Sequence, residues 1–213
     1  VKNFGGVPLV IGLKMPSELQ GIKRASVADT YAMIEQDLID AIPDLPKRSQ
    51  YNSADVGRAT QGAAQGYLAK VYLYQGKYTE AETELKKVIG RDEYAPGEYK
   101  LLTNYGDVWN VDVRNSEESL FEVQTNSDIA YNLGIRISIV CGSRNDSGWA
   151  WGLPTSNLEK AYTDAGDTER LRWTIIKDGA TTVPGDDSWS SSNTYTIAAT
   201  SHKSGRASRK VFI

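Results

Sequence analysis

The segment from Tyr131 to Trp151 holds the densest mixture of aromatic and planar polar side chains in the sequence. Its members are Tyr131, Asn132, Arg144, Asn145, Asp146, Trp149 and Trp151. Aromatic rings with a polar handle provide flat apolar faces, and amide, guanidinium and carboxylate groups provide directed hydrogen bonds. If the segment is extended, Trp149 and Trp151 fall on one face. This chemistry is typical of ligand binding, although at least one of the two tryptophans could instead anchor the segment onto neighbouring helices.

Three further tryptophans divide between the interior and the surface. Trp109 and Trp173 stand beside apolar residues, which predicts that both belong to the core. Trp189 lies within Asp186-Asp-Ser-Trp-Ser, a polar sequence that predicts an exposed loop. We therefore interpret Trp189 as a contact for a ligand or a partner protein.

The residues that catalysis would require are poorly placed. His202 stands in a Ser/Thr-rich sequence without a nearby aspartate, so a Ser-His-Asp triad has little support. Cys141 would need His202 as its base, and its apolar neighbours predict a small buried residue instead. Glycosidases need two carboxyl groups separated across a cleft, whereas Glu117-Glu118 and Asp186-Asp187 are adjacent. These observations predict a protein without catalytic activity.

Cofactor and metal signals are weak as well. Gly185-Asp-Asp-Ser188 could offer oxygen ligands to calcium, but it lacks the spacing of a recognised calcium loop. Glycine-rich nucleotide cradles are absent from the sequence. The single cysteine excludes an internal disulfide and a cysteine-ligated metal cluster. We expect no cofactor and no metal.

A helical hairpin is the strongest structural signal. Between Gly66 and Ile89, small and aromatic residues stand where a tetratricopeptide-type repeat needs them. The pattern predicts antiparallel helices over residues 60–75 and 79–89, with Ala69 facing Ala81 or its neighbours, because two helices approach closely where side chains are small. Leu85 and Val88 continue the apolar line of the second helix. Such a hairpin cannot bury its apolar face alone, which predicts neighbouring helices.

Another helix is predicted over residues 27–42. Ser26-Val-Ala-Asp29 has the form of a capping box, and Pro43 and Pro46 should stop the helix. Thr79-Glu-Ala-Glu82 and Ser156-Asn-Leu-Glu159 are similar boxes that predict two further helix starts. Short strands are expected over residues 119–125, 173–177 and 195–197, where β-branched and aromatic residues gather.

These elements predict a mainly α fold: tetratricopeptide-like helical hairpins with a large irregular segment that carries a few short strands. We expect one incomplete domain over 1–213, with a helical-repeat part over 1–90 and a mostly irregular ligand-binding part over 91–213. The chain begins without methionine and ends in an apolar stretch, so both ends read as cut. The net charge of −3 argues against nucleic-acid binding, and no apolar run is long enough to span a membrane.

In order and spacing, several motifs resemble the SusD/RagB family of nutrient-binding outer-membrane lipoproteins from Bacteroidetes. The matching pieces include Gly5-Gly-Val-Pro-Leu9, Gly57-Arg-Ala-Thr60, the hairpin from Leu68 to Tyr78, Asn115 to Gln124, and Gly152-Leu-Pro154. One departure is Asp167-Thr-Glu-Arg170, because the family usually has Asp-Pro-Arg at this point.

The resemblance implies non-catalytic capture of oligosaccharides, or of peptides in some members, for delivery to a SusC-like TonB-dependent transporter. It also implies a surface-exposed position at the cell outer membrane, through a lipid anchor in an N-terminal segment missing here. In such a protein the aromatic faces would meet the C–H faces of pyranose rings. A helical-repeat scaffold that binds a protein or peptide is the alternative, and a glycan-degrading enzyme is a weaker one. Which glycan or other nutrient is bound stays open.

Overall fold

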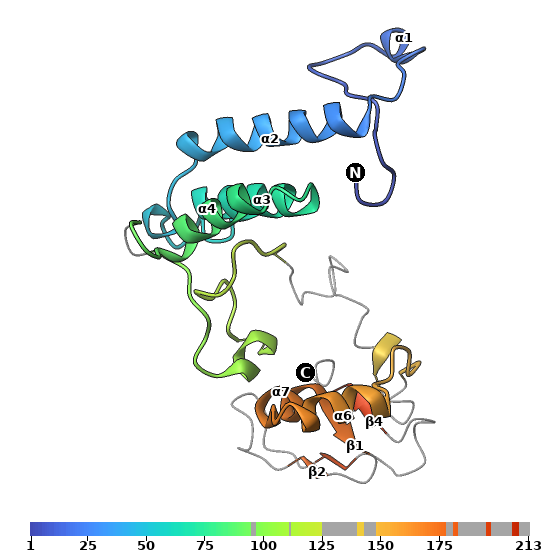
Figure 1. Ribbon diagram of the computed structural model, residues 1–213, viewed down its shortest axis with the longest axis vertical. Coiled ribbons are helices and arrows are strands. Elements are labelled where there is room, and N and C mark those ends of the chain that lie inside the picture. Colours follow the sequence, from blue (N-terminus) through green and yellow to red (C-terminus); the bar gives the residue numbers. More distant parts are fainter. Residues whose placement is uncertain are drawn as a thin grey trace. The chain divides into compact units, whose positions relative to one another are not determined.

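The computed structural model describes residues 1–94, 97–110, 112–124, 140–142, 148–177, 181–182, 195–196 and 206–208. The chain forms two compact units. The first unit combines Val1–Lys100 with Ser119–Glu122, and the second combines Leu101–Glu118 with Val123–Ile213. Helices dominate the described residues and strands are few and short (Figure 1), which confirms the predicted mainly α fold with tetratricopeptide-like hairpins.

The first unit is helical. It contains α1 (Pro16–Leu19), α2 (Val27–Asp44), the 3-10 helix η1 (Arg48–Gln50), α3 (Gln61–Tyr74) and α4 (Tyr78–Ile89). α3 and α4 form a hairpin, and α2 packs on α3 (Figure 1). The helices predicted over 27–42, 60–75 and 79–89 are thereby confirmed, with ends that differ by one or two residues.

Small side chains make the hairpin interface. Its buried residues are Ala63, Ala64, Leu68 and Ala69 of α3 and Ala81 and Val88 of α4. Ala69 and Ala81 are only 1% and 3% exposed, as the sequence predicted for a close approach of two helices. Leu85, expected on the same inner line, is instead 47% exposed on the outer side of α4.

The predicted cap of α2 is confirmed, whereas the predicted end of α2 and the predicted start of α4 are wrong. Ser26 Oγ accepts a hydrogen bond from the Asp29 amide at 2.9 Å and caps α2 as predicted. Pro43 does not stop α2, which runs to Asp44, because the Leu45 amide still bonds the Ala41 carbonyl at 3.0 Å and closes the last turn. The box at Thr79 does not start α4, which begins at Tyr78 after the chain turns at Gly76 with φ 74°.

The second unit mixes short helices with two-stranded pairings. It contains the 3-10 helix η2 (Tyr105–Trp109), α6 (Ser156–Asp164) and α7 (Thr168–Thr174). Strand β1 (Ile175–Lys177) pairs antiparallel with β4 (Arg206–Ser208), with Ile176 opposite Ala207. Strand β2 (Thr181–Thr182) pairs antiparallel with β3 (Tyr195–Thr196), which matches the strand expected near Tyr195.

Trp173 is the centre of the described core of this unit. It is 2% exposed and lies against Gly106 of η2, where a Cβ would come within 2.1 Å of the indole. Its predicted core position is confirmed, but Trp173 and Thr174 close α7 and the strand begins only at Ile175. Trp109 is half-buried.

Two further predictions in this region need correction. Residues 119–124 form no strand, and Leu120 instead lies against Gly66 of α3, so packing on a helix replaces pairing with a strand. α6 begins at Ser156, and its cap is the preceding Thr155, whose Oγ1 accepts a hydrogen bond from the Leu158 amide at 3.2 Å.

Candidate functional site

Among the predicted site residues, the structure describes two neighbouring indoles, and both are exposed. Trp149 is 52% exposed and Trp151 is 60% exposed. Their ring centroids are 5.6 Å apart, and the ring planes are inclined at 57°. The tryptophan pair, defined as these two side chains, therefore presents adjoining apolar faces to solvent.

The backbone that carries the tryptophan pair is not an extended strand. Ala150 has φ 55° and Gly152 has φ 65°, so the chain turns at both residues. The amides of Ala150 and Trp151 donate to the carbonyls of Gly142 and Val140 at 3.0 Å and 2.9 Å. The two indoles were expected to lie together through strand alternation. They do lie together, but a turn that is tied to residues 140–142 brings them there. A positive φ at alanine is uncommon and costs free energy that the surrounding bonds must offset.

The other predicted ligand residues lie outside the described residues: Tyr131, Asn132, Arg144, Asn145, Asp146 and Trp189. His202 lies outside them as well. Cys141 is a free, half-buried thiol beside the turn of the tryptophan pair. Among the described residues, no group of three or more His, Cys, Asp or Glu side chains is arranged to hold a metal ion. No helix in the described ranges is both long and apolar enough to cross a membrane.

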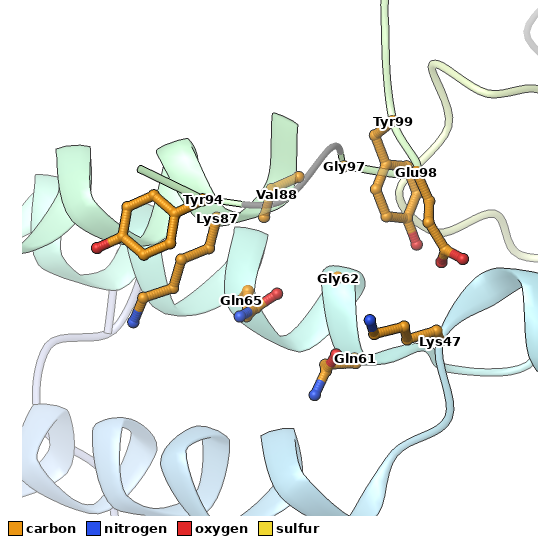
Figure 2. Close-up of a pocket in the computed structure, with 10 residues that line it drawn as sticks. All are labelled: Lys47, Gln61, Gly62, Gln65, Lys87, Val88, Tyr94, Gly97, Glu98 and Tyr99. Carbon is orange, nitrogen blue, oxygen red and sulfur yellow. The ribbon is translucent and has the colours of Figure 1, made fainter. Parts of the chain in front are cut away.

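A second candidate site, which the sequence did not indicate, lies in the helical unit. It is a pocket of about 160 Å³ between the first turns of α3 and the segment around the end of α4 (Figure 2). We call it the α3 pocket. Its lining residues are Lys47, Gln61, Gly62, Gln65, Lys87, Val88, Tyr94, Gly97, Glu98 and Tyr99.

Close packing fixes one wall of the α3 pocket. The hydroxyl groups of Tyr99 and Thr60 are hydrogen-bonded at 2.7 Å, and Thr60 Oγ1 also accepts the Ala63 amide as the cap of α3 at 3.0 Å. Gly62 allows the Tyr99 ring to lie directly on α3, since a Cβ at this position would be 2.3 Å from Cε2 of the ring. At Gly97 a Cβ would be 2.1 Å from the Val88 carbonyl oxygen, so this residue must also lack a side chain.

The charges around the α3 pocket are largely balanced. Burial raises the pKa of Glu98, but hydrogen bonds from Ser49 and the Arg48 backbone, together with the charge of Lys47, outweigh it and hold the pKa below its usual value. Glu98 is therefore ionised at neutral pH. Lys87 Nζ lies 2.7 Å from Glu84 Oε1, which offsets its charge.

The architecture is thus that of a helical-repeat protein with an exposed aromatic pair, and comparison with known proteins shows which proteins it resembles. Residues 1–73 match a family of SusD-like proteins described as starch-binding and associating with the outer membrane. A SusD-like protein of Bacteroides ovatus is 35% identical over 102 residues, which are 45% of this chain and 18% of that protein. The starch-binding protein SusD of Bacteroides thetaiotaomicron is 30% identical over 127 residues, or 57% of this chain and 22% of that protein.

The fold agrees with these sequence matches. A laminarin-binding SusD-like protein of known structure is 27% identical, with a TM-score of 0.76 over 97% of this chain and 46% of its own. The predicted resemblance is confirmed: the chain is similar to SusD-like proteins in sequence over residues 1–73 and in fold over 97% of its length. The matched regions span about a fifth of the curated relatives and just under half of the solved structure.

Proposed function

We propose that this chain contributes to non-catalytic capture of oligosaccharides, with the tryptophan pair as the binding platform. The observation that carries the proposal is the exposure of two adjoining indoles, at 52% and 60%, on a backbone that hydrogen bonds hold in place. Large exposed apolar side chains that lie together usually mark a binding surface. The names of two relatives, which describe starch binding and laminarin binding, support a carbohydrate as the ligand.

The chemistry of the indoles fits this ligand. The C–H faces of a pyranose ring are apolar, and they can cover an indole face with little loss of rotamer entropy on the protein side. Two faces inclined at 57° can contact successive rings of a chain that is not flat. In this proposal Tyr131 adds an aromatic face, Asn132, Arg144, Asn145 and Asp146 supply the hydrogen bonds to hydroxyl groups, and Trp189 adds a further contact.

The cellular context forms part of the same proposal. The family description names the outer membrane, and the family resemblance supports delivery of the captured glycan to a SusC-like TonB-dependent transporter. Surface exposure through a lipid anchor rests on the same resemblance. Because the chain matches a fraction of each relative, residues of a longer protein could complete the ligand site.

Calorimetry on tryptophan variants tests the platform. The probes are laminarihexaose and maltohexaose, fragments of laminarin and starch. We expect Trp149→Ala or Trp151→Ala to weaken binding of the preferred probe by roughly five- to 150-fold, which corresponds to about 1–3 kcal/mol. The melting temperature should stay near that of the parent, because both side chains are more than half exposed.

A matched control is Tyr78→Ala, which removes an aromatic ring that is 69% exposed on α4. It should leave the affinity for both probes unchanged. If the tryptophan variants bind as tightly as the parent, or if both melt far below it, the platform is wrong. Incubation with laminarin and starch should release no reducing ends, whereas their release would indicate a glycan-degrading enzyme.

Peptide binding remains the second candidate function, and one observation favours it. Tyr67 and Tyr74 of α3 are 50% and 49% exposed, two helical turns apart, with the exposed Lys70 between them. An aromatic and basic helix face is typical of helical repeats that bind peptides. If this function holds, Tyr67→Ala should abolish capture of acidic peptides from a synthetic library, while the tryptophan variants retain it.

A further inference from the structure

We propose that the α3 pocket is a subsite for a single neutral sugar ring, built from residues other than those of the tryptophan pair. The choice of a sugar as ligand class rests on the function proposed above. The location, size and polarity of the site rest on the pocket itself, which lies entirely within the helical unit.

The described residues leave part of the hydrogen-bonding capacity of the pocket lining unused. The Gln65 amide and the Tyr94 hydroxyl have no hydrogen-bond partner among the described residues, although both line the pocket (Figure 2). Gln61 uses Nε2 to bond the Ile42 carbonyl at 3.1 Å, and its Oε1 stays available as an acceptor. Half-buried polar groups of this kind gain free energy when a ligand supplies the missing partners.

The charges of the pocket lining favour a neutral ligand. Glu98 is ionised, Lys47 lies close enough to lower its pKa, and Lys87 is paired with Glu84. The lining therefore offers a carboxylate acceptor, an ammonium donor and amide groups that both donate and accept. A hydroxyl group also donates and accepts, so a neutral polyhydroxylated ring matches this set. An anion would meet the ionised Glu98 and is disfavoured.

The size and rigidity of the pocket also suit a single sugar ring. A volume of about 160 Å³ is below the roughly 300–1,000 Å³ of pockets that enclose drug-sized molecules, and it suits one ring. The Tyr94 ring offers an apolar face at one side of this space (Figure 2). The wall made by Gly62, Tyr99 and Thr60 is already fixed by packing and hydrogen bonds, so little ordering is needed when a ligand enters.

Backbone NMR of the full chain with D-glucose as the probe tests this subsite. We expect saturable shifts of the amides of Gln65 and Tyr94, and weaker shifts or none with D-glucuronate. Gln65→Leu or Tyr94→Ala should lower the affinity by about two- to tenfold. Gln20→Leu and Tyr78→Ala, which alter exposed side chains outside the pocket, are matched controls and should leave the affinity unchanged.

The two proposals fail separately. Trp149→Ala with Trp151→Ala should leave the glucose shifts intact, and Gln65→Leu should leave calorimetric binding of the oligosaccharide probes at the tryptophan pair intact. Failure to obtain saturable pocket shifts at tens of millimolar glucose overturns the subsite, even if the tryptophan variants lose oligosaccharide binding. Tighter binding of glucuronate than of glucose also overturns it. Conversely, saturable glucose shifts together with tryptophan variants of full affinity support the subsite and refute the platform.

Discussion

Replacing Gly62 by alanine should destabilise the helical unit, although the same change in a helix usually stabilises it. The new Cβ would lie 2.3 Å from Tyr99 Cε2, 3.0 Å from Cζ and 3.1 Å from the hydroxyl oxygen. The ring cannot withdraw freely, because it is 7% exposed and its hydroxyl is bonded to Thr60 at 2.7 Å. Moving the ring would also disturb the cap of α3.

Two effects of opposite sign decide the magnitude. Removing glycine from a helix gains up to about 1 kcal/mol. Overpacking typically costs about 1–3 kcal/mol, and a lost buried hydrogen bond adds about 0.5–1.5 kcal/mol. We expect Gly62→Ala to lower the free energy of unfolding by about 1–3 kcal/mol. For a chain of this length, that corresponds to a melting temperature lower by roughly 3–10 °C.

Gly66→Ala is the matched control, one turn further along α3. Its Cβ would lie 2.7 Å from Leu120 Cδ1, the mobile end of a side chain that can rotate away. This variant should stay within about 1 kcal/mol of the parent. Urea unfolding followed by far-UV circular dichroism compares the two. Equal stability of both variants would refute the argument that Tyr99 is locked. In the Tyr99→Ala background, Gly62→Ala should no longer destabilise, and a double-mutant cycle measures this coupling.

Three other predictions follow from contacts elsewhere in the chain. Ala69→Leu should lower the free energy of unfolding by about 1–3 kcal/mol through overpacking, since Ala69 is 1% exposed; a urea midpoint equal to that of the parent would contradict this. Burial raises the pKa of Glu35, but hydrogen bonds from Lys77 and Gln75 outweigh it, and the pKa lies below the usual glutamate value. The 2.6 Å ion pair of Glu35 with Lys77 should therefore stabilise the fold above about pH 4.3 and be lost as the pH falls through the lower folded pKa. Glu35→Gln should lower the free energy of unfolding by about 0.5–1 kcal/mol at neutral pH. In melting curves recorded over a pH series, the variant should also lose less stability than the parent as the pH falls through this range. Cys141→Ala and His202→Ala should leave oligosaccharide affinity in calorimetry unchanged, and loss of binding in both folded variants would revive a catalytic pair.

The helices could be predicted from the sequence because their signals are redundant. Apolar spacing, small residues at Ala69 and Ala81, and the Ser26 cap all indicate the same elements. The predicted start of a helix is wrong where two neighbouring residues can both act as its cap. Thr155 and Ser156 can both cap a helix, and local sequence does not decide between them. At Trp173 a short apolar run is compatible with helix or strand, and in the structure the helix that Asp167 caps extends through Thr174.

The candidate sites were less predictable, because tertiary contacts create them. The adjacency of Trp149 and Trp151 depends on a positive φ at Ala150, and alanine carries no sequence signal for that conformation. The α3 pocket joins Lys47 to residues as distant in sequence as Tyr99. Its spacing follows no motif, so periodicity cannot reveal it. The close approach of the Tyr99 ring to Gly62 is visible only after folding.

The way in which the chain is divided into two units limits how recombination between related genes can exchange them. The chain crosses from one unit to the other after Lys100, after Glu118 and after Glu122. The short segment Ser119–Glu122 therefore belongs to the first unit, although Leu101–Glu118 of the second unit precedes it in sequence. Leu120, which covers Gly66, lies in that short return. A single recombination crossover after Lys100 therefore separates α3 from its covering residue, and one after Glu122 divides the second unit. Gene shuffling should conserve both units together, and new ligand preferences should arise by point substitution within an inherited whole.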